Sequence, residues 1–508
     1  MAASGQYAPA PAAAKRDPRR LHNRLGCVVA SLLWITATAS AAPADPSPWA
    51  REIRDYAANS LDNADALSVA AVPLNGPGEP QFVNADTLMV PGSIMKVVTT
   101  FAALELLGPN YTWDTDVLTD GQLEGSTLKG NLYLRFGGDP KLTIERLWTS
   151  LGELHGMGID TIEGNLVLDG SYFQLTPEQP VFDDKGGNPY APFLVQPSPF
   201  LTNLNLQQFH LLADERGLRS WATPHLDSVR IDNRVIMTAP GRCPGRDALE
   251  WEPIFQDNGQ VVLRISGKLP KDCRTSNYLS LLPPQQYAFE LVRGLLAERG
   301  ITVKGSNQLA ATPEDSRRLV RTTSPDLATM VRDINKWSSN VMARQMLLSI
   351  GAEFRSDSDD RASGVRGVRN WLTKKGIDTT GLVIENGAGL SRDGRMTARQ
   401  GVQLLQEAWQ SPYAADLMAS MPIIALDGTM ARRLRNTGLV GEGRIKTGSL
   451  DNVRSIAGFT RDEHGTTWAV LAIVNNKPAW NGRAVLDRVL YTLYFRPPQG
   501  TPVSQLEQ

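Results

Sequence analysis

Cysteine and histidine are scarce in this sequence, which has 3 Cys and 5 His among its 508 residues. Protein sites for transition metals are built mainly from Cys, His and carboxylate side chains at short, regular spacings. The histidines beyond the first 41 residues are instead scattered with no ligand spacing: His155, His210, His225 and His464. The sequence therefore predicts no metal site, and nothing in it calls for an organic cofactor.

The sequence also lacks an apolar run long enough to span a membrane comfortably. The apolar run near the N-terminus, residues 27–35, follows a stretch with five basic residues and precedes Ala39-Ser40-Ala41. This order is typical of a cleaved secretory signal peptide. We therefore predict a signal peptide over residues 1–41, with an uncleaved signal anchor as the alternative. After cleavage, no integral membrane segment is expected.

A large excess of either charge is absent as well. Removal of residues 1–41 leaves 47 basic and 52 acidic residues, a net charge of −5 at neutral pH. A mildly acidic secreted chain with no basic tail is a poor nucleic-acid binder. We expect a small or polymeric substrate outside the cytoplasm and no nucleic-acid partner.

Only two cysteines remain after signal cleavage, because Cys27 lies within the signal peptide. An even number of cysteines in an oxidising compartment favours a disulfide, here between Cys243 and Cys273. Two separate buried thiols are the alternative.

The chain without its signal peptide is longer than a usual single core allows, so two or three domains are expected. Near the start, the residue patterns predict helices over 48–63 and 90–107 and a strand over 67–74. Near the end, they predict three short strands and a closing helix, over 443–450, 454–461, 466–474 and 481–495. We therefore predict one α/β domain built from both ends of the chain, residues 42–115 and 320–508.

The middle of the chain, residues 116–319, has a different residue pattern. It contains short strands such as 131–135 and 165–168, many Gly and Pro turns, and few long helical patterns. This pattern predicts a mostly β insertion, of one or two domains, that interrupts the α/β domain. The alternative is that these segments are ordinary elements of one large domain.

The most informative stretch is Ser93-Ile94-Met95-Lys96, which follows a Pro-Gly break. A Ser and a Lys three positions apart on a helix share one face, so the amine can reach the hydroxyl. A serine hydroxyl is a poor nucleophile until a base takes its proton, and a lysine whose pKa is lowered by burial or by other cations can be that base. Ser126-Thr127-Leu128-Lys129 has the same spacing in a turn-like context, and we interpret it as a chance match.

Two further motifs follow in the chain. Ser338-Ser339-Asn340 stands in a turn before a helical region, where short polar side chains can project into a cleft. Lys446-Thr447-Gly448-Ser449 lies on a predicted strand, where a lysine and a hydroxyl can hold a substrate carboxylate and Gly448 leaves room for the substrate backbone. Taken singly, these motifs also fit a helix cap and a solvated strand lysine. Together with Ser93, they predict an acyl-transfer site that contains no histidine.

The three motifs resemble those of the penicillin-recognising serine enzymes, and their spacing favours one group among them. Ser93 and Ser338 lie 245 positions apart, far more than in β-lactamases or simple carboxypeptidases. This interval is similar to that of the class C low-molecular-mass penicillin-binding proteins, the D-alanyl-D-alanine carboxypeptidase/endopeptidases, whose extra domains follow the nucleophile helix. Other matching stretches are Gly137–Pro140, Gly387–Arg392 and Lys446–Leu450. Ser339 and Ala388 depart from a frequent Asp and a frequent Ser, but they flank the implied catalytic groups.

The resemblance implies a domain of helices flanking a mostly antiparallel sheet, located in the periplasm and acting on peptidoglycan stem peptides and cross-links. It implies that Ser93 attacks the carbonyl of the penultimate D-Ala while Lys96 accepts its proton. Ser338 would relay a proton to the leaving amine. β-Lactams would acylate Ser93 and leave slowly, and no cofactor is implied.

The remaining roles concern substrate binding. The resemblance implies that Asn340 holds Lys96 and the substrate amide, while Lys446, Thr447 and Ser449 hold the terminal carboxylate. Asp169 resembles an acid that meets the amino group of the stem-peptide side chain, with a turn-capping Asp as the alternative. Arg392 could meet a side-chain carboxylate of diaminopimelate or form a structural ion pair.

Two other functions fit parts of this pattern. A β-lactamase would share the acylation chemistry, but it needs a group that activates the deacylating water, and the sequence offers none at a suitable spacing. A binding or scaffold protein with a dead site would lack catalytic residue types, whereas all those expected are present.

Overall fold

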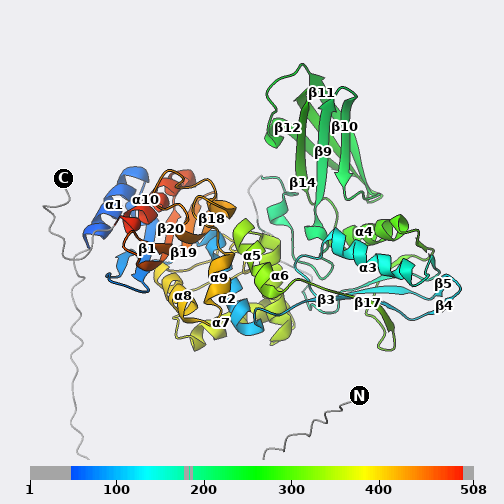
Figure 1. Cartoon of the computed structure of the whole chain (residues 1–508), viewed down its shortest axis with the longest axis horizontal. Helices are drawn as coiled ribbons and strands as arrows, with labels where there is room; N and C mark the ends of the chain where they lie inside the picture. Colours follow the sequence, from blue (N-terminus) through cyan, green and yellow to red (C-terminus); the bar gives the residue numbers. More distant parts are fainter. Residues whose placement is uncertain (1–46, 177–181, 183–186, 496–508) are drawn as a thin grey trace, which may run out of the picture. The chain divides into compact units, whose positions relative to one another are not determined.

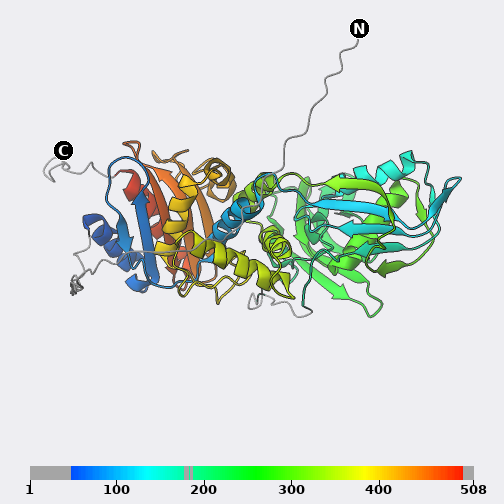
Figure 2. The same cartoon turned by 90° about the horizontal axis from the view of Figure 1, so that it is seen from below.

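The computed structural model describes residues 47–176, 182 and 187–495 (Figures 1 and 2). The predicted signal peptide, residues 1–41, lies outside the described residues, as does the polar tail beyond residue 495. None of the helices in the described part is both long and apolar enough to cross a membrane. Helices and β-sheets together make up the fold, as the predicted α/β class requires.

One five-stranded antiparallel sheet joins the two ends of the chain, in the order β18-β19-β20-β1-β2. Strand β1, from the N-terminal part, pairs along its whole length with β20, from the C-terminal part. This pairing is what a domain built from both ends needs. The strands span Leu67–Pro73 (β1), Gln81–Val83 (β2), Gly443–Leu450 (β18), Val453–Arg461 (β19) and Thr467–Asn475 (β20).

Both faces of this sheet are covered, so β1 is buried from Leu67 to Val72 rather than on alternate residues. Successive side chains of a strand point to opposite faces. Val69 and Ala71 pack in the cluster that includes α1 and α10, whereas Ala70 and Val72 pack in the cluster that includes α2 and α8. These helices span Pro48–Ser60 (α1), Met95–Leu107 (α2), Ala398–Gln410 (α8) and Gly482–Tyr494 (α10).

Helix α2, which follows Ser93, lies among the helices that pack on the Ala70 and Val72 side of the sheet. Ten of its 13 residues are buried, and a helix that is apolar on all sides must be enclosed by other elements. It contacts α5, α6, α7 and α9. These helices span Leu327–Trp337 (α5), Asn340–Glu353 (α6), Asp360–Lys374 (α7) and Ala414–Ser420 (α9).

The middle of the chain has its own hydrophobic cluster, which runs from Val117 to Val320. Strand β3 (Asp114–Thr119) pairs antiparallel with β17 (Arg317–Thr323), so the chain enters and leaves this region along neighbouring strands. The predicted boundaries at 116 and 319 fall inside these two strands. The division into a catalytic part and an inserted part stays a prediction, which this clustering supports.

The inserted region is more helical than its residue pattern indicated. It contains α3 (Ile144–Gly156) and α4 (Pro284–Glu298), which pack against each other and against its strands. Both helices bury an apolar face, built mainly from Leu in α3 and from Leu, aromatic and smaller aliphatic residues in α4. The strands form four sheets, β16-β8-β6-β3-β17, β15-β7-β5-β4, β10-β9-β14 and β11-β13-β12. The strands not yet given are Gln122–Glu124 (β4), Thr127–Lys129 (β5), Leu132–Phe136 (β6), Thr161–Ile162 (β7), Leu166–Asp169 (β8), Gln207–Asp214 (β9), Gly217–Thr223 (β10), Val229–Thr238 (β11), Leu249–Phe255 (β12), Val261–Pro270 (β13), Cys273–Leu279 (β14), Thr302–Val303 (β15) and Asn307–Leu309 (β16).

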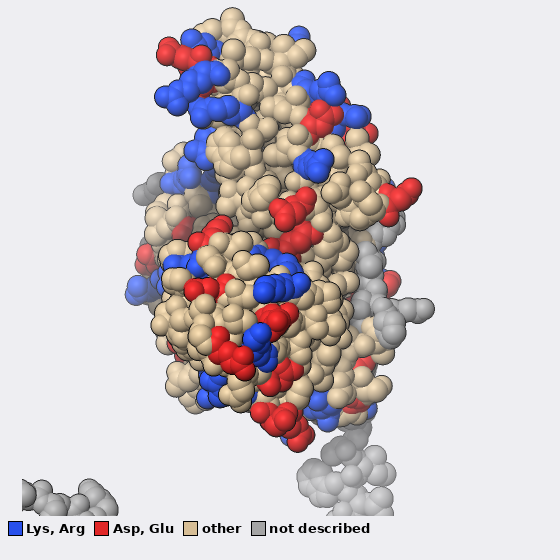
Figure 3. Space-filling model, turned by 90° about the vertical axis from the view of Figure 1, so that its right-hand side faces the viewer, with Lys and Arg blue, Asp and Glu red and all other residues tan. Residues whose placement is uncertain are grey.

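The predicted disulfide is confirmed. Cys243, in the loop before β12, is bonded to Cys273 at the start of β14, and their Cα atoms are 5.4 Å apart. The bond links the loop between β11 and β12 to β14, within the lobe that holds β9 to β14 (Figure 1). The face shown in Figure 3 carries Lys and Arg interspersed with Asp and Glu, without one broad area of a single sign.

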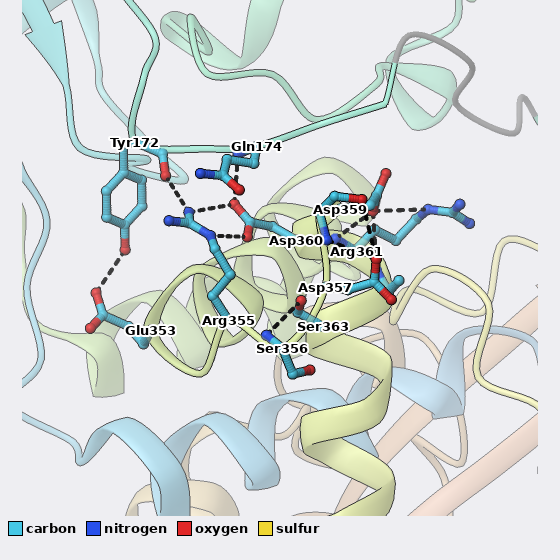
Figure 4. Close-up of polar contacts among 12 residues, drawn as sticks. Tyr172, Gln174, Glu353, Arg355, Ser356, Asp357, Asp359, Asp360, Arg361 and Ser363 are labelled. Atoms are coloured by element: carbon cyan, nitrogen blue, oxygen red, sulfur yellow. Dashed lines mark hydrogen bonds and ion pairs between the residues drawn. The ribbon is translucent and has the colours of Figure 1, made fainter.

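Polar contacts fasten the segment after β8 to the junction of α6 and α7 (Figure 4). The fully buried carboxylate of Asp360 accepts a hydrogen bond from the Gln174 backbone N–H at 2.7 Å and pairs with Arg355 at 2.8 Å. Arg355 also donates to the Tyr172 carbonyl at 2.9 Å. The Tyr172 hydroxyl donates to Glu353 at 2.9 Å. The inserted region is thereby joined to α6, the helix that begins at Asn340.

Candidate active site

Ser93 lies in a single 3-10 turn, Gly92–Ile94, that leads directly into α2. The sequence predicted one continuous helix from residue 90, so the α-helix begins five residues later than expected. Lys96 is the second residue of α2, and its Nζ lies 2.9 Å from Ser93 Oγ. The structure therefore brings together the serine and lysine of the first motif.

Lys96 is fully buried. Its Nζ donates hydrogen bonds to Asn340 Oδ1 and to the Ala388 backbone carbonyl, both at 2.6 Å. Burial lowers the pKa of Lys96 well below its ordinary value, and the nearby charges of Lys446 and Arg344 lower it further. All three causes favour the neutral amine, which is the form that can accept a proton.

The second motif stands at the junction of α5 and α6. Ser338 has φ of 59°, in the left-handed region, and this ends α5 and starts the turn into α6. Ser339 caps α6 by accepting a hydrogen bond from the Met342 backbone N–H. Ser339, which stands where the resembling family frequently has Asp, therefore still provides a capping side chain. Asn340 is the first residue of α6, and its Nδ2 donates to the Phe193 carbonyl at 2.9 Å.

The third motif lies on β18, which is an edge strand of the sheet. Lys446 is fully buried, and its Nζ donates to Ser338 Oγ at 2.8 Å and to the Thr447 carbonyl at 2.6 Å. Burial lowers the pKa of Lys446 to about 7. A Cβ at Gly448 would lie only 2.9 Å from the Ser93 backbone N, so this glycine lets β18 approach the turn that contains Ser93 closely.

These groups open onto one cleft with a volume of about 530 Å³. Of the predicted site residues, its lining includes Ser93, Ser338, Asn340, Thr447 and Ser449. Lys96 and Lys446 lie behind them, each in contact with one of the two serines. The cleft therefore has two serine–lysine pairs, Ser93 with Lys96 and Ser338 with Lys446.

The two secondary predictions have different outcomes. Asp169 is not among the residues that line this cleft. Its buried carboxylate accepts hydrogen bonds from the backbone N–H groups of Ser171 and Thr312, at 2.9 and 2.7 Å, which is the turn-capping alternative. Arg392 pairs at 3.2 Å with Asp451, which does line the cleft. A substrate contact by Asp169 or Arg392 stays a prediction.

The competing serine–lysine match is outside the site. Lys129 is at the end of β5, half-exposed, and pairs with Glu163 at 2.7 Å. Ser126 is exposed in the turn between β4 and β5. Neither residue lines the cleft that contains Ser93.

Several groups of the site were missed from the sequence, among them the Ala388 carbonyl, Arg344, Phe193 and Thr429. A backbone carbonyl has no side-chain signal of its own. Its neighbours Gly387 and Gly389 do offer one, since both have positive φ, 70° and 71°, and paired glycines indicate an unusual backbone path. Arg344 could not be singled out among the 52 Lys and Arg of the chain.

Helices around an antiparallel sheet, with two serine–lysine pairs at one cleft, define the class as a serine-type hydrolase of the penicillin-recognising kind. The chain belongs to the D-Ala-D-Ala carboxypeptidase 3 (S13) family, whose model matches residues 71–492. The resemblance and the enzyme class predicted from the motifs are thereby confirmed.

Similar proteins agree with this assignment. A D-alanyl-D-alanine carboxypeptidase from Actinomadura sp. (strain R39) is 30% identical over 408 residues, which cover 76% of this chain and 73% of that protein. D-alanyl-D-alanine carboxypeptidase DacB from Haemophilus influenzae is 26% identical over 403 residues, with coverages of 77% and 81%.

Solved structures confirm the predicted fold class. Penicillin binding protein 4 from Haemophilus influenzae superposes with a TM-score of 0.71 at 24% identity, covering 87% of this chain and 98% of that one. The same protein in complex with a β-lactam gives a TM-score of 0.69 at 23% identity, with the same coverages. A predatory endopeptidase from Bdellovibrio bacteriovorus gives 0.50 at 15% identity, with coverages of 86% and 95%.

Proposed function

We propose that this carboxypeptidase works through an acyl-enzyme on Ser93, with Lys96 as the base. The contacts of Lys96 Nζ carry the proposal. A neutral amine has two N–H donors and one lone pair, and the carbonyl oxygens of Asn340 and Ala388 account for both donors. The lone pair is then left for the hydroxyl hydrogen of Ser93, 2.9 Å away. Proton transfer to a positioned base contributes about 10²- to 10⁴-fold to such a reaction.

The oxyanion of the tetrahedral intermediate would be held by the backbone N–H groups of Ser93 and Ser449. Ser449 lies on an edge strand, where every second amide points away from the sheet. A Cβ at Gly92 would lie 3.7 Å from the Ser449 backbone N, and one at Gly448 would lie 2.9 Å from that of Ser93. This proximity supports a shared oxyanion site, because two aimed donors stabilise the developing charge.

Ser338 and Lys446 would act on the leaving group. Ser338 Oγ, in contact with Lys446 Nζ, can pass a proton to the leaving amine. The terminal carboxylate would bind at Thr447 and Ser449 beside the charge of Lys446. Because burial lowers the pKa of Lys446 to about 7, a bound carboxylate would raise it again and keep the lysine protonated. Water then releases the acyl group.

DD-endopeptidase activity follows from the same leaving-group contacts. In terminal D-Ala, the amine that leaves is next to a carboxylate on a D-configured carbon. The D-centre of a cross-linked diaminopimelate presents the same arrangement. A site that recognises one therefore accepts the other, provided that the rest of the leaving peptide has room.

Labelling with a fluorescent penicillin tests the acyl-enzyme. Wild-type protein should show a covalent band, and Ser93→Ala should show none while melting at an unchanged temperature. Ser126→Ala is the matched control and should label at the wild-type rate. Labelling of Ser93→Ala at the wild-type rate would exclude Ser93 as the nucleophile.

Product release then separates this enzyme from a β-lactamase. With a chromogenic β-lactam, a stoichiometric burst followed by slow turnover supports a penicillin-binding protein, whereas sustained turnover indicates a lactamase. Digestion of purified sacculi shows whether cross-links are cut as well as terminal D-Ala. We also propose that the chain works in the periplasm, since it is related to D-Ala-D-Ala carboxypeptidases and its substrate is in the wall. Fractionation of cells checks this.

A further inference from the structure

A second cavity opens beside the cleft of Ser93, also with a volume of about 530 Å³. Four arginines line it, and no Asp or Glu is part of its lining: Arg432, Arg433, Arg454 and Arg483. Trp480, whose side chain is 69% exposed, adds a large apolar surface at the same cavity. We call this space the arginine cavity. Concentrated charge of one sign favours an anionic ligand.

The four arginines differ in what they already bind. Arg433 is buried and paired with Asp487, and Arg454 donates to the Leu450 and Val453 carbonyls at 2.7 and 2.8 Å. Arg432 and Arg483 are exposed, and no hydrogen bond or ion pair reaches their side chains from the part of the chain that the structure describes. These two guanidinium groups keep all their donors for a ligand, and the planar guanidinium matches a carboxylate.

The arginine cavity is continuous with the active-site cleft. Thr429, Thr447, Ser449 and Arg454 line both spaces. Two of them, Thr447 and Ser449, are the residues assigned to the carboxylate next to the leaving amine. The leaving group therefore sits where the two spaces meet, and a larger leaving group has room to extend toward Arg432 and Arg483.

Terminal D-Ala carries only a methyl group on the carbon next to this carboxylate, so it cannot reach further. A cross-linked substrate does extend further, because its D-centre carries, in place of that methyl group, the rest of a stem peptide with additional carboxylates. We propose that the arginine cavity binds the anionic leaving peptide of a cross-link. The cavity thus distinguishes the endopeptidase reaction from the carboxypeptidase reaction at a single catalytic centre. This inference rests on the proposed function.

The test compares two substrates on the full mature enzyme. One is a monomeric pentapeptide, from which only terminal D-Ala can leave. The other is a tetrapeptide–tetrapeptide dimer, in which only the cross-link can be cut. Arg432→Gln combined with Arg483→Gln should lower kcat/KM for the dimer by about tenfold or more, since charged hydrogen bonds are lost. The same variant should change kcat/KM for the pentapeptide by less than about twofold, because D-Ala does not reach the cavity.

Two controls make the result specific. Arg435→Gln removes an exposed arginine of the same loop that is outside the cavity lining, and it should leave both substrates unaffected. The second control is a dimer in which the carboxylates of the leaving peptide are amidated, except the one next to the leaving amine. Wild type should cut it about tenfold more slowly than the unmodified dimer, and the double variant should cut the two dimers equally fast, because it has already lost those contacts.

The outcomes separate the inference from the proposed function. If wild-type enzyme is not acylated by penicillin and cuts neither substrate, the proposed function itself fails. If wild-type enzyme is active but the double variant loses both substrates equally, or loses neither, the arginine cavity does not bind the leaving peptide. Equal cutting of the amidated and unmodified dimers by wild type would also overturn the inference.

Discussion

Replacing Asn340 by Asp should move the acid limb of the acylation pH profile to higher pH. The proposed mechanism needs a neutral Lys96, and Asn340 Oδ1 accepts a hydrogen bond from its Nζ at 2.6 Å. An Asp side chain has nearly the same shape but brings a negative charge to that distance. The charge stabilises the protonated lysine, so the amine deprotonates only at higher pH. Asn340 is the first residue of α6, where a carboxylate is well tolerated, and the variant should fold.

The size of the shift follows from the distance. At an effective dielectric of about 20, two unit charges 2.6 Å apart attract by roughly 6 kcal/mol. Asn340 is half-exposed, and an introduced carboxylate loses some hydration, so we expect a pKa shift of about 1–3 units. Each unit corresponds to about 1.4 kcal/mol. Acylation should therefore slow by about 10- to 1,000-fold at pH values below the wild-type pKa of Lys96, by less between that pKa and the raised one, and recover as pH rises further.

The assay is the rate of acylation by a chromogenic β-lactam, measured from acid to alkaline pH in wild type, Asn340→Asp and Asn340→Ala. The alanine variant removes the acceptor without adding charge, so its rate should fall at every pH with no upward shift of the limb. An acid limb at the same pH in Asn340→Asp as in wild type would refute Lys96 as the base.

Three further results are expected. Lys96→Arg should abolish acylation, because arginine cannot give up its proton near neutral pH, whereas Lys446→Arg should be milder; equal losses would contradict the division of roles. The alkaline limb of kcat/KM for the pentapeptide should lie near the pKa of about 7 of Lys446, because the free enzyme loses that positive charge as pH rises. The alkaline limb of kcat should lie at higher pH, because the bound carboxylate restores the charge. Limbs at the same pH would show that Lys446 does not take part in carboxylate binding. Cys273→Ser should cost about 2–4 kcal/mol of unfolding free energy through loss of the bond to Cys243, while penicillin labelling of Ser93 persists; complete loss of labelling would show that the site depends on the disulfide.

The sequence identified those parts of the site that depend on side-chain type and local spacing. Ser93 and Lys96 were found because three positions bring side chains to one helix face, and their contact is observed at 2.9 Å. The contact between Ser338 and Lys446 joins residues 108 positions apart, so it could be inferred only from resemblance. The Ala388 carbonyl and the charge of Arg344 depend on tertiary packing, which local patterns do not encode.

The fold shows the same division. Strands β1, β18, β19 and β20 begin and end within one residue or so of the predicted limits, because branched residues and turn signals mark them locally. Helices α3 and α4 of the inserted region were not predicted from the sequence, because Gly- and Pro-rich turns surround them and dominate the composition. The boundaries at 116 and 319 fell inside β3 and β17 because a pairing between strands so distant in sequence leaves no local mark.

The burial of Lys96 and Lys446 has a consequence for how this protein can change over generations. Both side chains are fully enclosed and both have lowered pKa values, so the unfolded chain holds protons near neutral pH that the folded chain gives up. Each lysine therefore weakens folding, increasingly so as pH falls from about 10.5 toward its folded pKa. A methionine at position 96 would fill similar space without this cost, and the protein would be more stable and inactive. In the proposed mechanism both lysines take part in the reaction, so we expect a descendant released from catalysis to lose them early.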